Sequence, residues 1–292
     1  MVYDLIDSYL AIPRTSFKGR MRGFAKFLSR QSRRLQWDHW NAIGGMCRRA
    51  DAVICSTEEQ GRDIGQFCSN VHTILDMHSS VVRTIKTDYS VGRPFKLVWE
   101  GLPQTLCSLE LIAPALRELR RRHDLQLNLV TDLEYYRYLG RYGKTETRQA
   151  AQRLFSEVRL HEWKEDVCSR VICSCDLAVI PLAAGDPFAF GKPENKLLLF
   201  WRMGMPAVTS ATPAYDRAMR GAGLDLTCAH AGDWLAVLER FILDETARRE
   251  AGTRGKAYVE GEFSEEKLLG CWDNVFASLG LDFGVHGVPL RR

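Results

Sequence analysis

Long apolar runs are missing from this sequence. The longest, such as Leu197–Trp201, fall far short of the ~20 residues that a membrane span needs. The region after Met1 also lacks the basic, then apolar, then small-residue order of a signal peptide. We therefore expect a protein that is neither integral to a membrane nor secreted by that route.

Cysteine pairs at metal-ligand spacing are missing as well. The nine cysteines are scattered and odd in number, which predicts reduced thiols in a cytosolic protein. Only Cys173 and Cys175 lie close together, and a one-residue gap without a second pair or a histidine cluster is poor zinc spacing. We expect a buried thiol at a strand edge there, with no metal site.

The sequence has little excess of either charge sign. It holds 40 Lys+Arg against 36 Asp+Glu, and a net charge of +4 is too small to indicate a nucleic-acid partner. With 46% hydrophobic residues, the composition excludes disorder, collagen-like repeats and a coiled-coil rod. Its 292 residues allow one large domain or two small ones.

The positive charge is concentrated between residues 14 and 34. This segment carries eight Lys and Arg residues and no acid, with phenylalanines between them. Phe24, Leu28, Leu35 and Trp40 recur at roughly helical spacing, which predicts an amphipathic helix. Its basic face is either simply solvated or binds anionic lipid head groups, and basic residues interleaved with Phe suit an interface.

The alternation of strands and helices predicts parallel α/β sheets. We expect a helix after Cys55 with Ser56 as its N-cap and an interdomain connection over 79–94. A helix is expected over 105–121. The pattern of Asn195–Arg202 predicts another helix, which ends at Gly204. The expected strands cover 2–6, 52–55, 71–75, 95–99, 125–131, 158–160, 175–182 and 207–210, and helical segments cover 232–243, 245–261 and 264–279.

Polar residues gather at the expected strand ends of the second half. In a doubly wound sheet, ligands bind where strands end and helices begin. Glu100-Gly101, Asp132 and Trp163 each follow a strand. We therefore expect these residues to face a common ligand.

The loop over residues 183–196 is rich in Gly, Pro and charge and leads into a helix N-terminus. Free N–H groups and the helix dipole attract phosphate at such a position. Lys192 and Lys196 would add positive charge, and Glu194 or Asp186 could accept hydrogen bonds from hydroxyls. The alternative is a surface loop whose lysines are merely solvated.

Residues 49–57 and residues 192–210 are two segments with a recognisable pattern, and together they resemble the large retaining GT-B glycosyltransferase family, the family 4 type also called glycosyltransferases group 1. Residues 49–57 (Arg-Ala-Asp-Ala-Val-Ile-Cys-Ser-Thr) resemble a segment that normally lies late in its N-terminal domain. Residues 192–210, which begin Lys-Pro-Glu-Asn-Lys, resemble a donor-domain segment of the family. Residues 176–182 and Ala214-Tyr215 are similar to the strand before that segment and the turn after it. The resemblance covers roughly residues 45–280.

The resemblance implies an α/β, GT-B-like fold with two Rossmann-like domains, of which the N-terminal one is incomplete. The expected ranges are 1–90 for the partial acceptor-side domain and 91–262 for the nucleotide-sugar-binding domain. Residues 263–292 would form a C-terminal helix and tail.

The implied activity is transfer of a sugar from a nucleotide-diphosphate sugar to an acceptor, in surface polysaccharide or glycolipid assembly. The expected partners are the nucleotide sugar and a glycan or lipid-linked acceptor, with no metal or other cofactor. The 14–34 segment would bring the enzyme to an anionic membrane surface. The protein would then be cytoplasmic and peripheral at the inner face of the membrane.

By motif position, Lys196 would neutralise diphosphate charge as the sugar leaves, an electrostatic catalytic role. Glu194 is the second catalytic candidate. Trp163 or its neighbours could flank the base, and Glu100-Gly101 would lie near the donor phosphates. The donor-binding set is completed by Asp132, Asp186, Lys192 and Asn195.

Three departures from the family pattern keep alternatives open. Leu199 stands where the family has an acid that binds ribose, and Leu102-Pro103-Gln104 stands where Arg and Lys often occur. Only about 80–90 residues precede the C-terminal domain, so the early strands and the glycine-rich acceptor loop have no counterpart. One alternative is a truncated, non-catalytic relic that binds nucleotide sugar or a partner protein. The other is a GT-B nucleotide-sugar epimerase, which would need acidic and His residues in both domains.

Overall fold

A computed structural model of the chain describes residues 1–13, 17–30, 32–35, 37–138, 142–155, 157–183 and 185–281. The chain forms two compact units. Unit 1 consists of Met1–Asp76, Gly185–Pro193 and the described residues from Glu262 onward, and unit 2 of Met77–Ala184 and Glu194–Gly261. This division differs from the expected ranges, because 77–90 group with unit 2 whereas 185–193 and the last helix group with unit 1.

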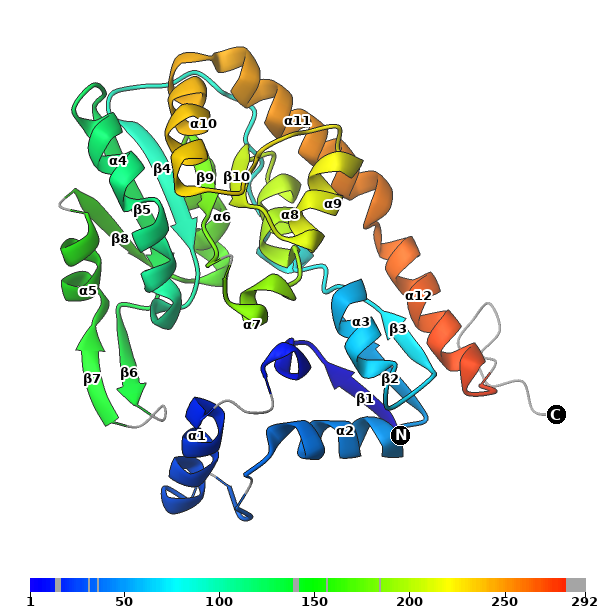
Figure 1. Cartoon of the computed structure of the whole chain (residues 1–292). Helices are drawn as coiled ribbons and strands as arrows, with labels where there is room; N and C mark the ends of the chain where they lie inside the picture. Colours follow the sequence, from blue (N-terminus) through cyan, green and yellow to red (C-terminus); the bar gives the residue numbers. More distant parts are fainter. Residues whose placement is uncertain are drawn as a thin grey trace. The chain divides into compact units, whose positions relative to one another are not determined.

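Unit 1 is built on a three-stranded parallel sheet in the order β1-β2-β3 (Figure 1). Its strands are β1 (Val2–Leu5), β2 (Ala52–Cys55) and β3 (Val71–Thr73). The helices are η1 (Tyr9–Ala11), α1 (Phe17–Leu28), α2 (His39–Arg49), α3 (Glu58–Ile64), α7 (Pro187–Phe190) and α12 (Glu265–Ser278).

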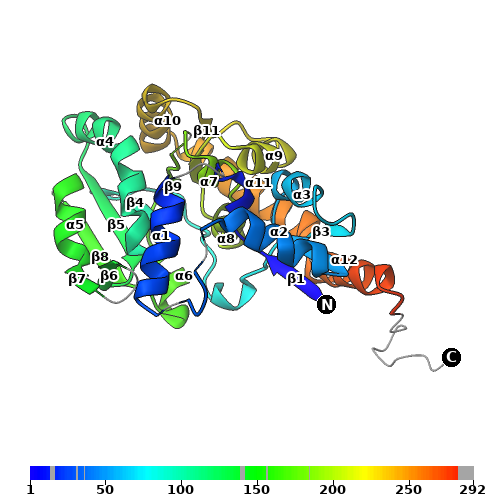
Figure 2. The same cartoon turned by 60° about the horizontal axis from the view of Figure 1, so that its bottom comes forward.

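Strand β2 separates two apolar layers in unit 1, because successive side chains point to opposite faces of a sheet. Val53 and Cys55 pack with Cys47 of α2 and Ile64 of α3. Ala52 and Ile54 pack on the other side with residues of α12. The elements around this sheet can be followed in Figure 2.

Unit 2 contains a six-stranded sheet in the order β11-β10-β9-β4-β5-β8, in which every pairing is parallel. Counted in chain order from β4, this arrangement is 3-2-1-4-5-6, the order of the doubly wound dinucleotide-binding fold. Its connections reverse direction between β4 and β9. The strands are β4 (Phe95–Glu100), β5 (Leu125–Thr131), β8 (Val158–Glu162), β9 (Leu177–Ile180), β10 (Ala207–Ser210) and β11 (Thr227–Cys228).

Helices follow the strands of unit 2 along the chain. A two-stranded antiparallel hairpin, β6 (Glu134–Tyr138) and β7 (Tyr142–Glu146), stands apart from the main sheet. The helices are η2 (Ser79–Val81), η3 (Pro103–Leu111), α4 (Ala113–Arg120), α5 (Thr147–Leu154), α6 (Glu165–Cys173), α8 (Asn195–Arg202), α9 (Pro213–Gly221), α10 (Ala231–Leu243) and α11 (Glu245–Glu262).

The expected strands are confirmed to within a few residues, and the helix expected at Asn195–Arg202 is α8. The helix expected over 105–121 is wrong in form, because the chain makes the 3-10 helix η3 and then restarts as α4 with Pro114 in its first turn. The expected cap Ser56 is also wrong. Thr57 caps α3, and its side chain accepts a hydrogen bond from Gln60 N at 3.2 Å.

The basic segment forms α1, which confirms a helix at Phe24 and Leu28. The predicted helical spacing does not continue, because Leu35 lies outside any helix and Trp40 belongs to the separate helix α2. Arg14 lies outside the described residues, and so do the side chains of Lys18, Arg20 and Arg22. The rings of Phe17 and Trp37 and the side chain of Leu28 are exposed. Within the part of the chain that is described, no helix is both long and apolar enough to traverse a bilayer.

All nine cysteines are free thiols. Cys175 is buried immediately before β9, which confirms the buried thiol expected at a strand edge, and its neighbour Cys173 is half-buried. Burial raises the pKa of Cys175 to about 12, so this thiol stays protonated at neutral pH.

Candidate functional site

The candidate site lies at the carboxyl edge of the six-stranded sheet, where β4 and β9 lead in opposite directions. Lys196, in the first turn of α8, reaches the end of β4. Its ammonium donates a hydrogen bond to the Glu100 backbone carbonyl and lies 3.6 Å from Glu100 Oε2. The same nitrogen lies 5.3 Å from the centre of the Trp99 ring. The structure therefore brings Lys196 and Glu100 together.

Glycine at position 101 leaves the space that Lys196 occupies. A Cβ on Gly101 would lie 2.8 Å from Lys196 Nζ and 2.9 Å from the Trp99 ring. Both separations are too short for non-bonded atoms, so a side chain here would displace the ammonium. Gly101 thus permits the cation to sit against the strand end.

A second acid and a buried phenol lie close to this cation. Glu194 is buried at the N-cap position of α8. Burial raises the pKa of the Tyr215 phenol well above its usual value, and the charges of Glu194 and Glu100 raise it further. The hydroxyl of Tyr215 in α9 therefore keeps its proton across the physiological range. Nothing in the sequence pattern signals that a tyrosine 21 residues after Glu194 faces the same charges.

Three buried polar side-chain atoms at this edge have no hydrogen-bond partner among the described residues: Thr131 Oγ1, Asn195 Oδ1 and Thr212 Oγ1. Thr131 ends β5, Asn195 begins α8, and Thr212 precedes α9 just after β10. Buried polar atoms are normally paired, because leaving them unpaired costs ~1–3 kcal/mol each. These three atoms are available to a polar ligand at this edge.

Asp132 and Trp163 occupy the ends of the neighbouring strands β5 and β8. Trp163 N donates to the Thr131 carbonyl at 3.0 Å, and the indole is 39% exposed, so its face is available for stacking. The Asp132 side chain is exposed, while its carbonyl accepts a hydrogen bond from Thr147 Oγ1 at 2.6 Å. Both residues thus lie on the same sheet edge as Glu100.

Asp186 and Lys192 belong to unit 1, unlike the other candidate residues. Asp186 caps the short helix α7, and its Oδ1 accepts a hydrogen bond from Phe188 N at 3.0 Å. Lys192 Nζ lies 5.7 Å from the centre of the Phe188 ring. Their part in donor binding stays a prediction.

The expected loop 183–196 is divided between the units because its middle is hydrogen-bonded within unit 1. The Gly191 carbonyl accepts from Ser8 Oγ at 2.6 Å and from Gln60 Nε2 at 3.1 Å. A Cβ on Gly191 would lie 2.2 Å from Ser8 Oγ, so only glycine fits there. Sequence periodicity contains no signal for partners so far apart in the chain.

The geometry in unit 2 suits an anion with a hydroxyl-bearing group attached. Lys196 and the N-terminus of α8 supply positive potential, which attracts phosphate. The unpaired atoms of Asn195, Thr131 and Thr212 can exchange hydrogen bonds with hydroxyls. The Trp163 ring offers an apolar face at the end of β8.

No family model matches the chain, and no curated protein sequence matches it. Several solved structures do match the chain. HepE of Anabaena in complex with UDP and glucose is 13% identical with a TM-score of 0.65, and the alignment covers 96% of this chain and 71% of HepE. A glycosyltransferase from Rickettsia africae is 10% identical with a TM-score of 0.60, covering 82% of this chain and 67% of that one.

TarM of S. aureus, in a complex that includes UDP, is 12% identical with a TM-score of 0.58. The alignment covers 81% of this chain and 46% of TarM, so the chain spans less than half the length of that protein. These likenesses concern the fold. The chain has the mixed α/β, GT-B-like fold with parallel sheets that its sequence predicts.

Proposed function

We propose that this chain is a glycosyltransferase that binds a nucleotide-diphosphate sugar at the carboxyl edge of unit 2. The observation that carries the proposal is the placement of Lys196. Its ammonium lies at the N-terminus of α8 and against the end of β4, where the sheet connections reverse direction. Likeness to HepE, whose structure contains UDP and glucose, supports the same assignment.

In this proposal the donor diphosphate meets the first turn of α8. Lys196 then exchanges part of its interaction with Glu100 for the phosphate oxygens. Glu194 and Asn195 lie at the same helix start, where they form hydrogen bonds with the nucleotide sugar. Trp163 flanks the base. Asp132 completes the proposed donor-binding set of unit 2.

The proposed reaction is of the retaining, family 4 type and uses no metal. The bond between the anomeric carbon and the diphosphate oxygen breaks, and a bond from the same carbon to the acceptor hydroxyl oxygen forms. The departing diphosphate oxygen takes the hydroxyl proton. Lys196 and the α8 N-terminus stabilise the negative charge that develops on that oxygen, which is where electrostatic catalysis acts.

Calorimetric titration with UDP, GDP and UDP-glucose tests the site. Lys196→Ala is expected to weaken nucleotide binding by roughly 1–3 kcal/mol, because it removes a charge-assisted contact. Lys256→Ala is the matched control, since Lys256 also pairs with a glutamate, Glu260, but lies on α11. Equal affinities for wild type and Lys196→Ala would remove Lys196 from the site.

A second candidate function follows from Leu199, which is buried in α8 where the family has its ribose-binding acid. A chain without that acid could bind nucleotide sugar without transferring the sugar. Nucleotide binding by calorimetry, combined with no release of UDP from UDP-sugars in the presence of glycan acceptors, would favour this non-catalytic role over the transferase.

We further propose that the acceptor is a glycan or lipid-linked glycan of surface polysaccharide or glycolipid assembly, met at the cytoplasmic face of a membrane. The exposed Phe17, Leu28 and Trp37 occur in the same stretch of sequence as Lys26, Arg30, Arg33 and Arg34. Apolar side chains among cations suit an anionic lipid surface.

Vesicle flotation tests the membrane proposal. Binding to vesicles containing phosphatidylglycerol should fall steeply as salt rises, because the lysine and arginine charges are screened. Lys26→Glu with Arg30→Glu should reduce binding, whereas Lys256→Glu with Arg254→Glu on α11 should not. Flotation that ignores both salt and lipid charge would leave the 14–34 segment as a solvated helix face.

A further inference from the structure

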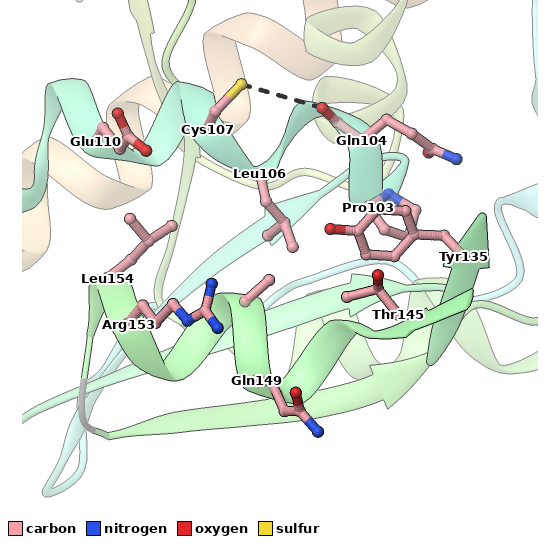
Figure 3. Close-up of a pocket in the computed structure, with 11 residues that line it drawn as sticks. Pro103, Gln104, Leu106, Cys107, Glu110, Tyr135, Thr145, Gln149, Arg153 and Leu154 are labelled. Atoms are coloured by element: carbon pink, nitrogen blue, oxygen red, sulfur yellow. Dashed lines mark hydrogen bonds between the residues drawn. The ribbon is translucent and has the colours of Figure 1, made fainter. Parts of the chain in front are cut away.

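A separate cavity lies in unit 2, between η3, the β6–β7 hairpin and α5 (Figure 3). Its volume is about 390 Å³, within the range of small-ligand pockets. It is distinct from the Lys196 cluster, whose residues do not line it. Nothing in the proposed donor site accounts for this cavity.

The cavity combines apolar and hydrogen-bonding side chains. Figure 3 shows the Tyr135 ring beside Pro103 and Gln104, and Arg153 extending from α5 below Leu106. Pro103 and Leu106 are buried and contribute apolar surface, with Ala150 and Leu154 partly buried. The exposed polar side chains of the lining are Gln104, Glu110, Gln149 and Arg153.

The formal charges of the lining cancel. Arg153 is its one cation and Glu110 its one anion, and neither has an ion pair with any residue in the described part of the chain. A diphosphate would gain one cation but face one carboxylate. A wholly apolar ligand would remove water from four hydrogen-bonding side chains and would offer them no hydrogen bonds in its place. The lining therefore suits a neutral ligand that is rich in hydroxyls.

We propose that this cavity binds a short, neutral saccharide. A sugar ring has an apolar C–H face, which fits the Tyr135 ring and the apolar lining. Its hydroxyls both donate and accept, which matches the amides of Gln104 and Gln149 and the charged groups of Arg153 and Glu110. The hairpin that carries Tyr135 is a separate two-stranded sheet, and its Tyr135 and Thr145 both line the cavity.

The cavity is connected to the donor site through the backbone. Glu100 and Gly101 contact Lys196, and Pro103 and Gln104 follow after a single residue and line the cavity. A glycan bound here would hold its chain next to the segment that forms the donor site. Only the identification of this glycan as the acceptor chain rests on the proposed function; saccharide binding does not.

Cys107 offers a direct measure of occupancy because it lines the cavity and is the only one of the nine cysteines that is exposed rather than buried or half-buried. The experiment measures Cys107 alkylation by iodoacetamide with peptide mass spectrometry. The probes are oligosaccharides of glucose, N-acetylglucosamine and rhamnose, at tens of millimolar, and UDP alone. Cys271 on α12 of unit 1 is the internal reference thiol.

At least one neutral oligosaccharide should slow Cys107 alkylation about tenfold at saturation without changing Cys271, since occupancy covers the thiol. Tyr135→Ala and Arg153→Ala should each weaken the protecting affinity by about tenfold. Tyr136→Ala is the matched control, because Tyr136 is the next residue of the same strand and does not line the cavity. Wild-type affinity is expected for that variant.

Three results would overturn the proposal: no protection by any oligosaccharide, equal protection by UDP alone, or protection that survives both Tyr135→Ala and Arg153→Ala. Nucleotide binding is read separately by calorimetry on the same variants. Saccharide protection without nucleotide binding would contradict the transferase but not this cavity. Nucleotide binding without saccharide protection would contradict the saccharide cavity but not the transferase.

Discussion

The two units of this protein treat the ends of their parallel strands differently. In unit 1, the polar groups after β1 and β2 are hydrogen-bonded to each other. Gln60 Oε1 accepts from Ser56 N at 2.8 Å, and Gln60 Nε2 donates to Ile6 O at 2.9 Å, to Ser8 Oγ at 2.9 Å and to Gly191 O at 3.1 Å. We refer to these residues as the Gln60 network.

In unit 2, the corresponding edge leaves polar atoms unpaired. Thr131 Oγ1, Asn195 Oδ1 and Thr212 Oγ1 are buried without partners among the described residues, and Lys196 lies beside them in the first turn of α8. Unit 1 therefore pairs its strand-end polar groups with one another, whereas unit 2 leaves these three atoms unpaired. This difference supports placing the donor site in unit 2.

The largest effect is expected from breaking the Gln60 network. Gln60→Leu removes four hydrogen bonds at a side chain that is 3% exposed and leaves Ser56 N and the Ile6 carbonyl unpaired. Unfolding free energy should fall by about 2–4 kcal/mol. Hydrogen exchange should show faster exchange in β1, β2 and residues 185–193 than in unit 2.

Gln66→Leu is the control for this prediction, because Gln66 is exposed and lies outside the network. Its effect should stay within about 0.5 kcal/mol. A Gln60→Leu protein as stable as wild type would show that the polar groups of unit 1 do not depend on each other, and the contrast between the units would fail.

A matched pair of threonines tests the contrast directly. In unit 1, Thr57 Oγ1 accepts from Gln60 N at 3.2 Å and caps α3, so Thr57→Val should cost about 1–2 kcal/mol of stability. In unit 2, Thr212 Oγ1 has no partner among the described residues, so Thr212→Val should leave stability unchanged or raise it by about 1 kcal/mol.

The effects of these two substitutions on nucleotide affinity should have the opposite order to their effects on stability. Thr212→Val should weaken UDP binding in calorimetry by about 1 kcal/mol, because it removes a hydroxyl available to the ligand. Thr57→Val should leave UDP binding unchanged. If Thr212→Val destabilises the protein as much as Thr57→Val, the Thr212 hydroxyl is structural and the open edge of unit 2 is not a binding feature.

The sequence predicts the sheets of both units well, because their strands are short buried apolar runs. Leu125–Thr131 is buried throughout, and α8 starts and ends as its pattern indicates. The hairpin β6–β7 is not predicted, because its tyrosines, arginines and glycine lack the alternation of a half-buried strand. Helix α7 is missed because it is a single turn started by Asp186 and Pro187 inside a loop.

The candidate site is predicted in part for a similar reason. Residues at strand ends, such as Glu100 and Trp163, follow from topology alone, since parallel strands end at a common edge. Partners that lie far apart in the chain cannot be predicted from topology. The attachment of Gly191 to Ser8 joins residues 183 positions apart, and the approach of Tyr215 to Glu100 depends on packing between separate helices and strands.

The smallest predicted effect concerns a polar pair in the sheet of unit 2, formed by His161 of β8 and Asn128 of β5. His161 Nε2 lies 3.0 Å from Asn128 Oδ1, so the ring donates, and Asn128 Nδ2 donates to the Leu97 carbonyl at 3.3 Å. Burial, and then the charge of Arg159, lower the pKa of His161 below its ordinary value. The folded protein thus holds this ring neutral.

Because the unfolded chain binds the proton more readily, the His161 contribution lowers stability as pH falls below about 6.5, until the folded ring is also protonated. His161→Gln keeps a donor for Asn128 but cannot titrate. Urea unfolding at pH 7.5 and 5.5 should therefore show a smaller loss of stability on acidification for His161→Gln than for wild type. Equal losses would mean that the His161 ring is open to water and that burial does not hold it neutral in the folded protein.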